Sequence, residues 1–170
     1  MVGRFYTDRD NSRPLKAVTS HGTPNMKSLN PSFAEDVSRS FAQQPIMNLI
    51  GARLSLVEPG VVEITLPYRD DLAQQHGYLH AGVVATIADS ACGYAAFTLM
   101  PAGSNVLSVE FKVNLLRPAQ GLEFVARAEV IKAGRTLTVV RADVFGIDDK
   151  AGKELVATMQ ATMISLHREE

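Results

Sequence analysis

Residues Gly82 to Met100 read GVVATIADSACGYAAFTLM, a run of small and apolar side chains whose only charge is the carboxylate of Asp89. The run predicts one long helix, and its many Ala and Gly residues allow other elements to approach the helix axis closely, as in a buried helix. Burying a carboxylate among such residues costs free energy unless the group is paired or used. Asp89 is therefore the first candidate functional residue.

Strands are predicted on both sides of this helix. Arg53 to Glu58 and Val61 to Leu66 flank the turn Pro59-Gly60, which indicates a hairpin. Four further runs follow the helix: Asn105 to Leu116, Leu122 to Ile131, Thr136 to Phe145 and Leu155 to Ser165. The short turns between these runs predict antiparallel neighbours in a meander, since a parallel return needs a crossover of about a dozen residues or more.

The first of these four runs has the clearest alternation in the chain. Its apolar residues Leu107, Val109, Phe111, Val113 and Leu115 point one way, and the polar residues between them point the other way. This pattern predicts a half-buried strand with its apolar side against the core.

The order of these elements predicts the fold class. One long helix between the second and third of about six strands has one economical arrangement, in which an antiparallel sheet curls around the helix and buries it. An amphipathic helix is predicted over Phe33 to Gln44, where apolar residues recur every four positions, and Pro45 ends it. A short turn through Met47 and Leu49 then leads to Gly51. The predicted class is α+β with an extra N-terminal helix.

The composition limits the kind of protein. With 170 residues, 46% of them hydrophobic, the chain fits one globular domain over residues 32–170 after a flexible extension over residues 1–31. The net charge of −1 and the scattered basic residues predict no binding to nucleic acid or to a membrane. The lone Cys92 fits a reducing compartment, and no secretory signal is expected. A cytoplasmic protein is therefore expected.

At the entrance to the long helix, the stretch Gln74-x-x-Gly77-x-x-His80-Ala81-Gly82, followed by Asp89, resembles the signature of the hotdog-fold thioesterases. It is most similar to the phenylacetate-degradation (PaaI) branch, which has an amide residue, a Gly, a His-Gly-Gly segment and an acid at these positions. The match reaches from Ala34 to Leu166 and includes Leu107-Ser108-Val109, Leu116-Arg117-Pro118 and Ala133-Gly134-Arg135-Thr136-Leu137. The resemblance implies a hotdog fold that hydrolyses an acyl-CoA thioester without a cofactor.

The resemblance also implies a role for each matching position. Asp89 corresponds to the catalytic carboxylate, acting as nucleophile or as base on water, and Ser108 to a polar strand residue near it. Gln74 corresponds to the residue that positions water or the thioester. The backbone N–H of Ala81 corresponds to the donor that binds the thioester carbonyl, with Gly82 beside it in the substrate-binding segment. The family usually has Gly where this chain has Ala81, and a positive φ there would strain Ala.

Helix geometry separates two of these groups. Ala81 begins the helix, where free N–H groups and the positive end of the dipole stabilise a developing oxyanion. Asp89 lies about 12 Å further along the axis, too far for both groups of one chain to act on one carbonyl. Two helices packed antiparallel across a two-fold axis bring Ala81 of one copy to Asp89 of the other, so a homodimer at least is expected. The resemblance implies a dimer of dimers, a homotetramer.

Several residues have a second interpretation. Asp89 is alternatively a structural carboxylate that pairs with the opposite subunit. His80 is either a general base or a packing and hydrogen-bonding residue before the helix. Arg117 and Arg135 either bind the phosphates of coenzyme A or are solvated surface residues. His76 and His80 have no third ligand in view, so no metal site is expected.

Two other functions compete with hydrolysis. A hydratase or dehydratase of the same fold would need a catalytic His near an acid. A non-catalytic acyl-CoA binding or sensing module would retain acyl-CoA without releasing a free thiol. Cys92 lies one helical turn from Asp89 among small residues, so it is expected to be a buried small hydrophobe rather than a nucleophile.

Overall fold

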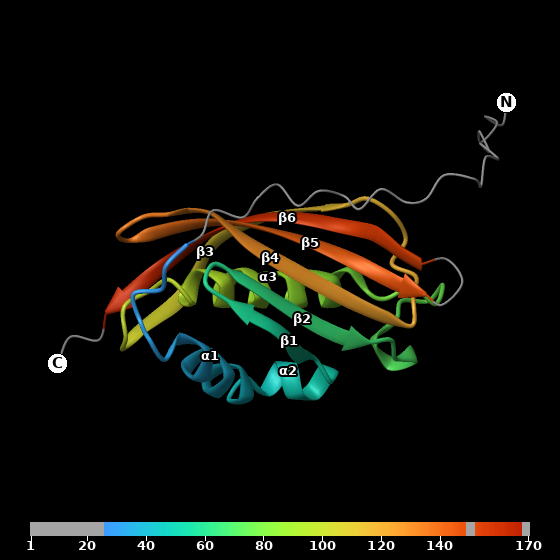
Figure 1. Cartoon of the computed structure of the whole chain (residues 1–170). Coiled ribbons are helices and arrows are strands. Elements are labelled where there is room, and N and C mark those ends of the chain that lie inside the picture. The colour runs from blue at the N-terminus through green and yellow to red at the C-terminus, as the bar shows by residue number, and fades with distance from the viewer. Residues whose placement is uncertain (1–25, 149–151, 168–170) are drawn as a thin grey trace, which may run out of the picture.

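The computed structural model describes residues 26–148 and 152–167 (Figure 1). Two short helices, α1 (Phe33–Ala42) and α2 (Pro45–Ile50), precede a hairpin of β1 (Arg53–Glu58) and β2 (Val61–Pro67). A 3-10 turn at Asp70–Leu72 leads to the long helix α3 (Ala81–Phe97). Four longer strands complete the fold: β3 (Ser104–Leu115), β4 (Glu123–Ala133), β5 (Leu137–Asp148) and β6 (Gly152–His167).

The six strands form one antiparallel sheet that curves around α3, in the order β1-β2-β4-β5-β6-β3 (Figure 1). Helix α3 packs against the strands from β2 to β6. Its buried side is rich in alanine, and Ala88, Ala91, Ala95 and Ala96 are fully buried. Small side chains allow the sheet to approach the helix axis closely. The predicted α+β hotdog architecture, with its sheet wrapped around one long helix, is confirmed.

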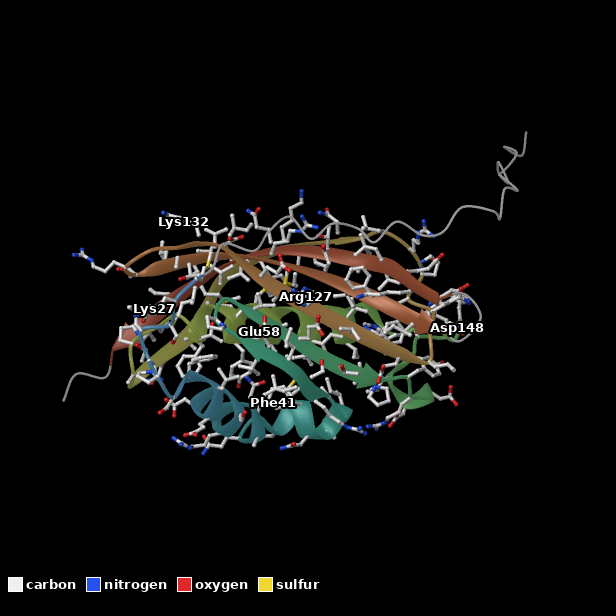
Figure 2. The ribbon with its side chains drawn as sticks, in the orientation of Figure 1. Lys27, Phe41, Glu58, Arg127, Lys132 and Asp148 are labelled. Atoms are coloured by element: carbon white, nitrogen blue, oxygen red, sulfur yellow. The ribbon has the colours of Figure 1, made fainter. Side chains whose placement is uncertain are left out.

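Helix α1 forms where the spacing predicts it and ends at Ala42 rather than Gln44. Its apolar side is buried through Val37 and Phe41. The ring centroid of Phe41, labelled in Figure 2, lies 5.8 Å from that of Tyr94 in α3. This contact attaches α1 to the central helix.

The turn predicted through Met47 and Leu49 is wrong, because these residues belong to α2. Pro45 occupies the start of this helix, where its missing N–H would have no intrahelical acceptor and its fixed φ suits the helix. Gly51 ends α2 with a left-handed φ of 78°. Pro45 therefore separates two helices instead of ending helical structure.

The predicted meander is correct for β4, β5 and β6 but wrong for β3. Strand β3 pairs with β6 at the edge of the sheet, and β4 pairs with β2. The connection from Leu116 to Leu122 is about 23 Å long when extended. That length exceeds the three strand spacings of about 4.8 Å that separate β3 from β4. Loop length alone therefore did not determine the neighbour of β3.

A bulge interrupts the alternation of β3. The register of β3 against β6 shifts after Ser108, which leaves Val109 as an extra residue. Ser108 pairs with the buried Met163 and so faces α3, whereas Leu107 and Val109 are 57% and 55% exposed. Downstream of the bulge, Phe111 lies on the α3 side as predicted. The predicted single apolar face is therefore wrong for the first half of the strand.

Thr98 joins the C-terminal end of α3 to the β1–β2 turn. Its buried Oγ1 accepts a hydrogen bond from the N–H of Gly60 at 2.7 Å and donates one to the carbonyl of Ala95, also at 2.7 Å. Both bonds are shielded from water, so they fix how the hairpin sits against the helix.

Thr98→Val should lower the unfolding temperature by several degrees. Valine keeps the shape of the side chain but leaves the buried N–H of Gly60 without an acceptor, which costs about 1–3 kcal/mol. Thermal unfolding followed by circular dichroism measures the change. Thr65→Val is the matched control, because the hydroxyl of Thr65 donates only to the exposed Ser55. Equal unfolding temperatures for the wild type and Thr98→Val would contradict this role.

The described part of the predicted N-terminal extension, residues 26–31, contacts the domain. The hydroxyl of Ser28 donates to the carbonyl of Thr98 at 2.6 Å. Asn30 is buried, and its amide donates to Asp36 of α1 at 2.8 Å. Residues 1–25 lie outside the described residues. None of the described helices is long and apolar enough to cross a membrane.

Candidate active site

Helix α3 begins with a cap made by His80. The backbone of His80 is extended, with φ −62° and ψ 135°, and its Nδ1 accepts the N–H of Gly82 at 2.9 Å. A Cβ on Gly82 would lie 3.1 Å from that Nδ1, so glycine leaves room for the imidazole. Because Nδ1 accepts, the neutral ring carries its proton on Nε2. His80 thus has the geometry of a helix cap.

Ala81 is the first residue of α3 and is exposed. No non-glycine residue in the described ranges has a positive φ, so Ala81 takes its place in the helix without the strain considered above. The first N–H groups of a helix have no intrahelical acceptor. The Ala81 N–H is therefore available to a substrate carbonyl at the positive end of the helix dipole.

Gln74 lies in a compact loop before α3. The N–H of Gln74 donates to the carbonyl of Tyr78 at 2.8 Å, and the N–H of Gly77 donates to the carbonyl of Gln74 at 2.9 Å. The side-chain Oε1 of Gln74 accepts the N–H of His76 at 2.6 Å. These bonds hold Gln74 half-buried beside Ala81, and both residues line a cavity of about 280 Å³.

Arg117 lines the same cavity as Gln74 and Ala81. Its guanidinium pairs with Glu154 at 2.9 Å, and both side chains are at least half exposed, so the pair contributes little to stability. Arg135 lies exposed in the β4–β5 turn, at the other end of β4. The structure therefore places only one of the two predicted phosphate-binding arginines near the helix N-terminus.

Asp89 lies midway along α3 and faces the bulged part of β3. The hydroxyl of Ser108 donates to its Oδ1 at 2.6 Å. Asp89 is half-buried, so in a single chain it is neither unpartnered nor fully buried, contrary to the simplest interpretation of its sequence surroundings. The bulge at Val109 is what turns Ser108 toward the carboxylate.

A groove of about 560 Å³ extends from Asp89 between α1, α3 and β3. One wall is polar: Ser40 Oγ lies 3.3 Å from the hydroxyl of Tyr94, and Ser90 Oγ lies 3.5 Å from the amide oxygen of Gln44. Burial raises the pKa of Tyr94 above its ordinary value, against the opposing effect of hydrogen bonds with Ser40 and Gln44. The phenol is therefore protonated at neutral pH and can donate or accept a hydrogen bond.

The groove and the cavity at the helix N-terminus have no lining residue in common. Within one chain the structure brings Asp89 together with Ser108, and Gln74 together with Ala81. It does not bring the two pairs together. Each chain thus presents two separate halves of the predicted constellation.

Cys92 is fully buried, and burial, followed by the nearby charge of Asp89, raises the pKa of its thiol far above the ordinary value. The interpretation of Cys92 as a buried small hydrophobe is confirmed, because such a thiol does not ionise near neutral pH. Within residues 26–148 and 152–167, no group of three or more His, Cys, Asp or Glu side chains is placed to hold a metal ion.

The polar wall of the groove was not predicted from the sequence. Ser40 belongs to α1, whereas Gln44 has an extended backbone and is the N-cap of α2. Ser90 and Tyr94 are four residues apart and lie about one turn from each other on the same side of α3. Spacing therefore indicated only the pair on α3, and no local pattern showed that α1 and the start of α2 would pack beside Asp89.

Comparisons with known proteins agree with this architecture. Residues 76–153 match the family model of the Thioesterase superfamily. A solved thioesterase family protein from Silicibacter pomeroyi is 52% identical, with a TM-score of 0.78 over 79% of this chain and 98% of that chain. Human acyl-coenzyme A thioesterase 13 is 27% identical over 135 residues, which are 78% of this chain and 93% of the relative.

The Escherichia coli PaaI protein from the phenylacetic acid degradation operon shares the fold, with a TM-score of 0.71 at 17% identity, over 82% of this chain and 96% of that chain. The fold and the likeness to the Silicibacter pomeroyi protein define a hotdog thioesterase. The chain belongs to the thioesterase superfamily. The prediction that it is a thioester-hydrolysing enzyme is confirmed at that level.

Proposed function

We propose that this enzyme hydrolyses acyl-CoA thioesters at a site between two copies of the chain, with Asp89 from one copy and the Ala81 N–H from the other. The observation that carries the proposal is the separation of these groups. They line different cavities and lie about 12 Å apart along α3, so one chain alone cannot apply both to one carbonyl. The likeness to human acyl-coenzyme A thioesterase 13 supports coenzyme A as the thiol part of the substrate.

Strand β3 is where we expect the second copy to join. It is one of the two edge strands of the described sheet and exposes the apolar side chains of Leu107, Val109 and Leu115. Natural proteins usually cover an apolar edge of this kind. Pairing two β3 strands about a two-fold axis covers the edge and sets the α3 helices antiparallel, so that Ala81 faces Asp89 of the partner subunit. Such dimers would then pair into a tetramer.

The chemistry of this site is simple. The thioester carbonyl oxygen accepts the Ala81 N–H, where the helix dipole stabilises the negative charge that develops on that oxygen. The opposing Asp89 either attacks the carbonyl carbon or takes a proton from an attacking water molecule. The tetrahedral intermediate then collapses and expels the thiolate of coenzyme A. Where Asp89 itself attacks, water next hydrolyses the acyl–Asp89 anhydride, which releases the acid and restores the carboxylate. A thiolate leaves without prior protonation, so no catalytic triad is required, and the sum is acyl-CoA plus water giving acid plus free coenzyme A.

Neighbouring side chains would orient Asp89 and hold the substrate at the Ala81 N–H. The hydroxyl of Ser108 holds Oδ1 of Asp89 at 2.6 Å and leaves Oδ2 for water or substrate. Gln74, fixed in its loop, would position the thioester or the water beside Ala81. Arg117 lines the same cavity, so its guanidinium is placed to bind a phosphate of coenzyme A.

A thiol-release assay on acetyl-, octanoyl- and phenylacetyl-CoA tests the proposed function. We expect free coenzyme A to accumulate with at least one of these substrates, and light scattering to give the mass of two or four chains. Acyl-CoA that is retained without thiol release would instead favour the binding module. Absence of both release and retention would contradict acyl-CoA as the ligand.

A further inference from the structure

Gly93 lies one helical turn after Asp89 and lines the groove that extends from the carboxylate. The turn raises it about 6 Å along the helix axis on the same side of α3. An acyl group whose carbonyl carbon reaches Asp89 would therefore pass Gly93 next. Gly93 is therefore placed to contact the acyl part of a substrate.

The two usual structural reasons for glycine do not apply to Gly93. Its φ is not positive, so it needs no left-handed backbone. A Cβ built on it meets no atom within 4 Å outside the neighbouring helix backbone, so no close packing requires its small size. Glycine nevertheless weakens the interior of a helix relative to alanine. Its presence leaves space in the groove that a side chain would fill.

The groove at Gly93 is lined by residues from several elements. Ser40 comes from α1 and Gln44 from the N-cap of α2. Tyr94 and Phe97 lie along α3, and Val106 comes from β3. The volume of about 560 Å³ is in the range of small-molecule sites. Gly93 belongs to this lining but contributes no side chain to it.

We propose that Gly93 is a specificity-determining residue, which keeps the groove beside Asp89 open to acyl groups longer or bulkier than acetyl. This inference rests on the proposed thioester hydrolysis. A side chain at position 93 would block the path beyond the carbonyl carbon and leave the reacting atoms in place. A larger side chain at position 93 should therefore change the preference between acyl groups more than it changes the rate of the chemical step.

Gly93→Leu and Gly93→Ala test the inference in the full-length enzyme. The measurement is kcat/KM for acetyl-CoA and octanoyl-CoA, reported as the ratio between the two substrates. In Gly93→Leu the ratio should shift toward acetyl-CoA by about 30-fold or more, the scale on which pockets exclude extra methylenes. Gly93→Ala should shift it in the same direction by less. It should also raise the unfolding temperature by about 2 °C, because alanine favours the helix where space is free.

Ala34→Leu is the matched control, because it adds leucine to the exposed side of α1 outside the groove. Its substrate ratio should equal that of the wild type. An unchanged ratio in both Gly93 variants overturns the inference, and so does loss of the dimer in both, since Gly93 would then be an assembly contact. These outcomes differ from failure of the proposed function, in which the wild type itself releases no thiol from either substrate.

Discussion

Asp89→Asn lowers kcat by about 10²- to 10⁴-fold on every acyl-CoA that the wild type hydrolyses, the range in which acid–base groups contribute. Asparagine has the same shape and can still accept the hydrogen bond from Ser108 through its amide oxygen. It can neither take a proton from water nor attack a carbonyl as a carboxylate does. The unfolding temperature and the oligomeric state should therefore stay those of the wild type while thiol release collapses.

Asp143→Asn supplies the control for this substitution. Asp143 lies on β5 on the side of the sheet turned away from α3, where it pairs with Arg141 and accepts a hydrogen bond from Thr158 at 2.7 Å. The same carboxylate-to-amide change there should leave kcat near its wild-type value. Near-normal turnover in Asp89→Asn would exclude the carboxylate from the chemistry and make it a structural group.

Ala81→Pro removes the proposed oxyanion donor and should lower kcat by about 10²- to 10³-fold, as loss of one such donor does. Proline is tolerated at the first position of a helix, where its N–H is not needed. It also requires an extended residue before it, and His80 already has φ −62° and ψ 135°. The helix should therefore form as before. Ala81→Gly keeps the N–H and should retain activity, which makes it the matched control.

A mixture of Asp89→Asn and Ala81→Pro chains tests whether the two groups act from different subunits. Each mixed dimer then keeps one intact site, made of Ala81 from the first variant and Asp89 from the second. With random exchange of subunits, half of the dimers are mixed and each has one of two sites, so activity should recover to about a quarter of the wild-type value. The recovered activity is measured as thiol release after the two variants are refolded together. A mixture no more active than the separate variants would mean that both groups act within one chain.

The fold was predictable where a local pattern matched one element. The run from Gly82 to Met100 predicted α3, and the turn at Pro59-Gly60 predicted the β1–β2 hairpin. The neighbours of β3 were not predictable in this way, because they depend on which distant strand it meets. The bulge at Val109 was not predictable either, because the sequence alternates as it would in a regular strand.

The candidate site was predictable as a set of positions but not as an arrangement. Helix spacing placed Asp89 about two turns beyond Ala81, and resemblance singled out Ser108, which the structure then places against Asp89. Alternation alone would have assigned Ser108 to the face turned away from the helix. The wall formed by Ser40 and Gln44 could not be predicted, because it depends on the long-range packing of α1 and the start of α2 beside α3.

The bulge in β3 also has a meaning in terms of folding energetics. A regular strand would turn Leu107 and Val109 toward the core and Ser108 away from it, which is the register that the hydrophobic pattern favours. The observed register exposes the two apolar residues and brings a hydroxyl to Asp89 instead. The first half of β3 is thus locally frustrated, and conflicts of this kind concentrate where a protein functions. Dimerisation would offset the cost of this register, because a second copy would cover the exposed Leu107 and Val109. The same register that serves the catalytic group Asp89 would therefore also favour assembly.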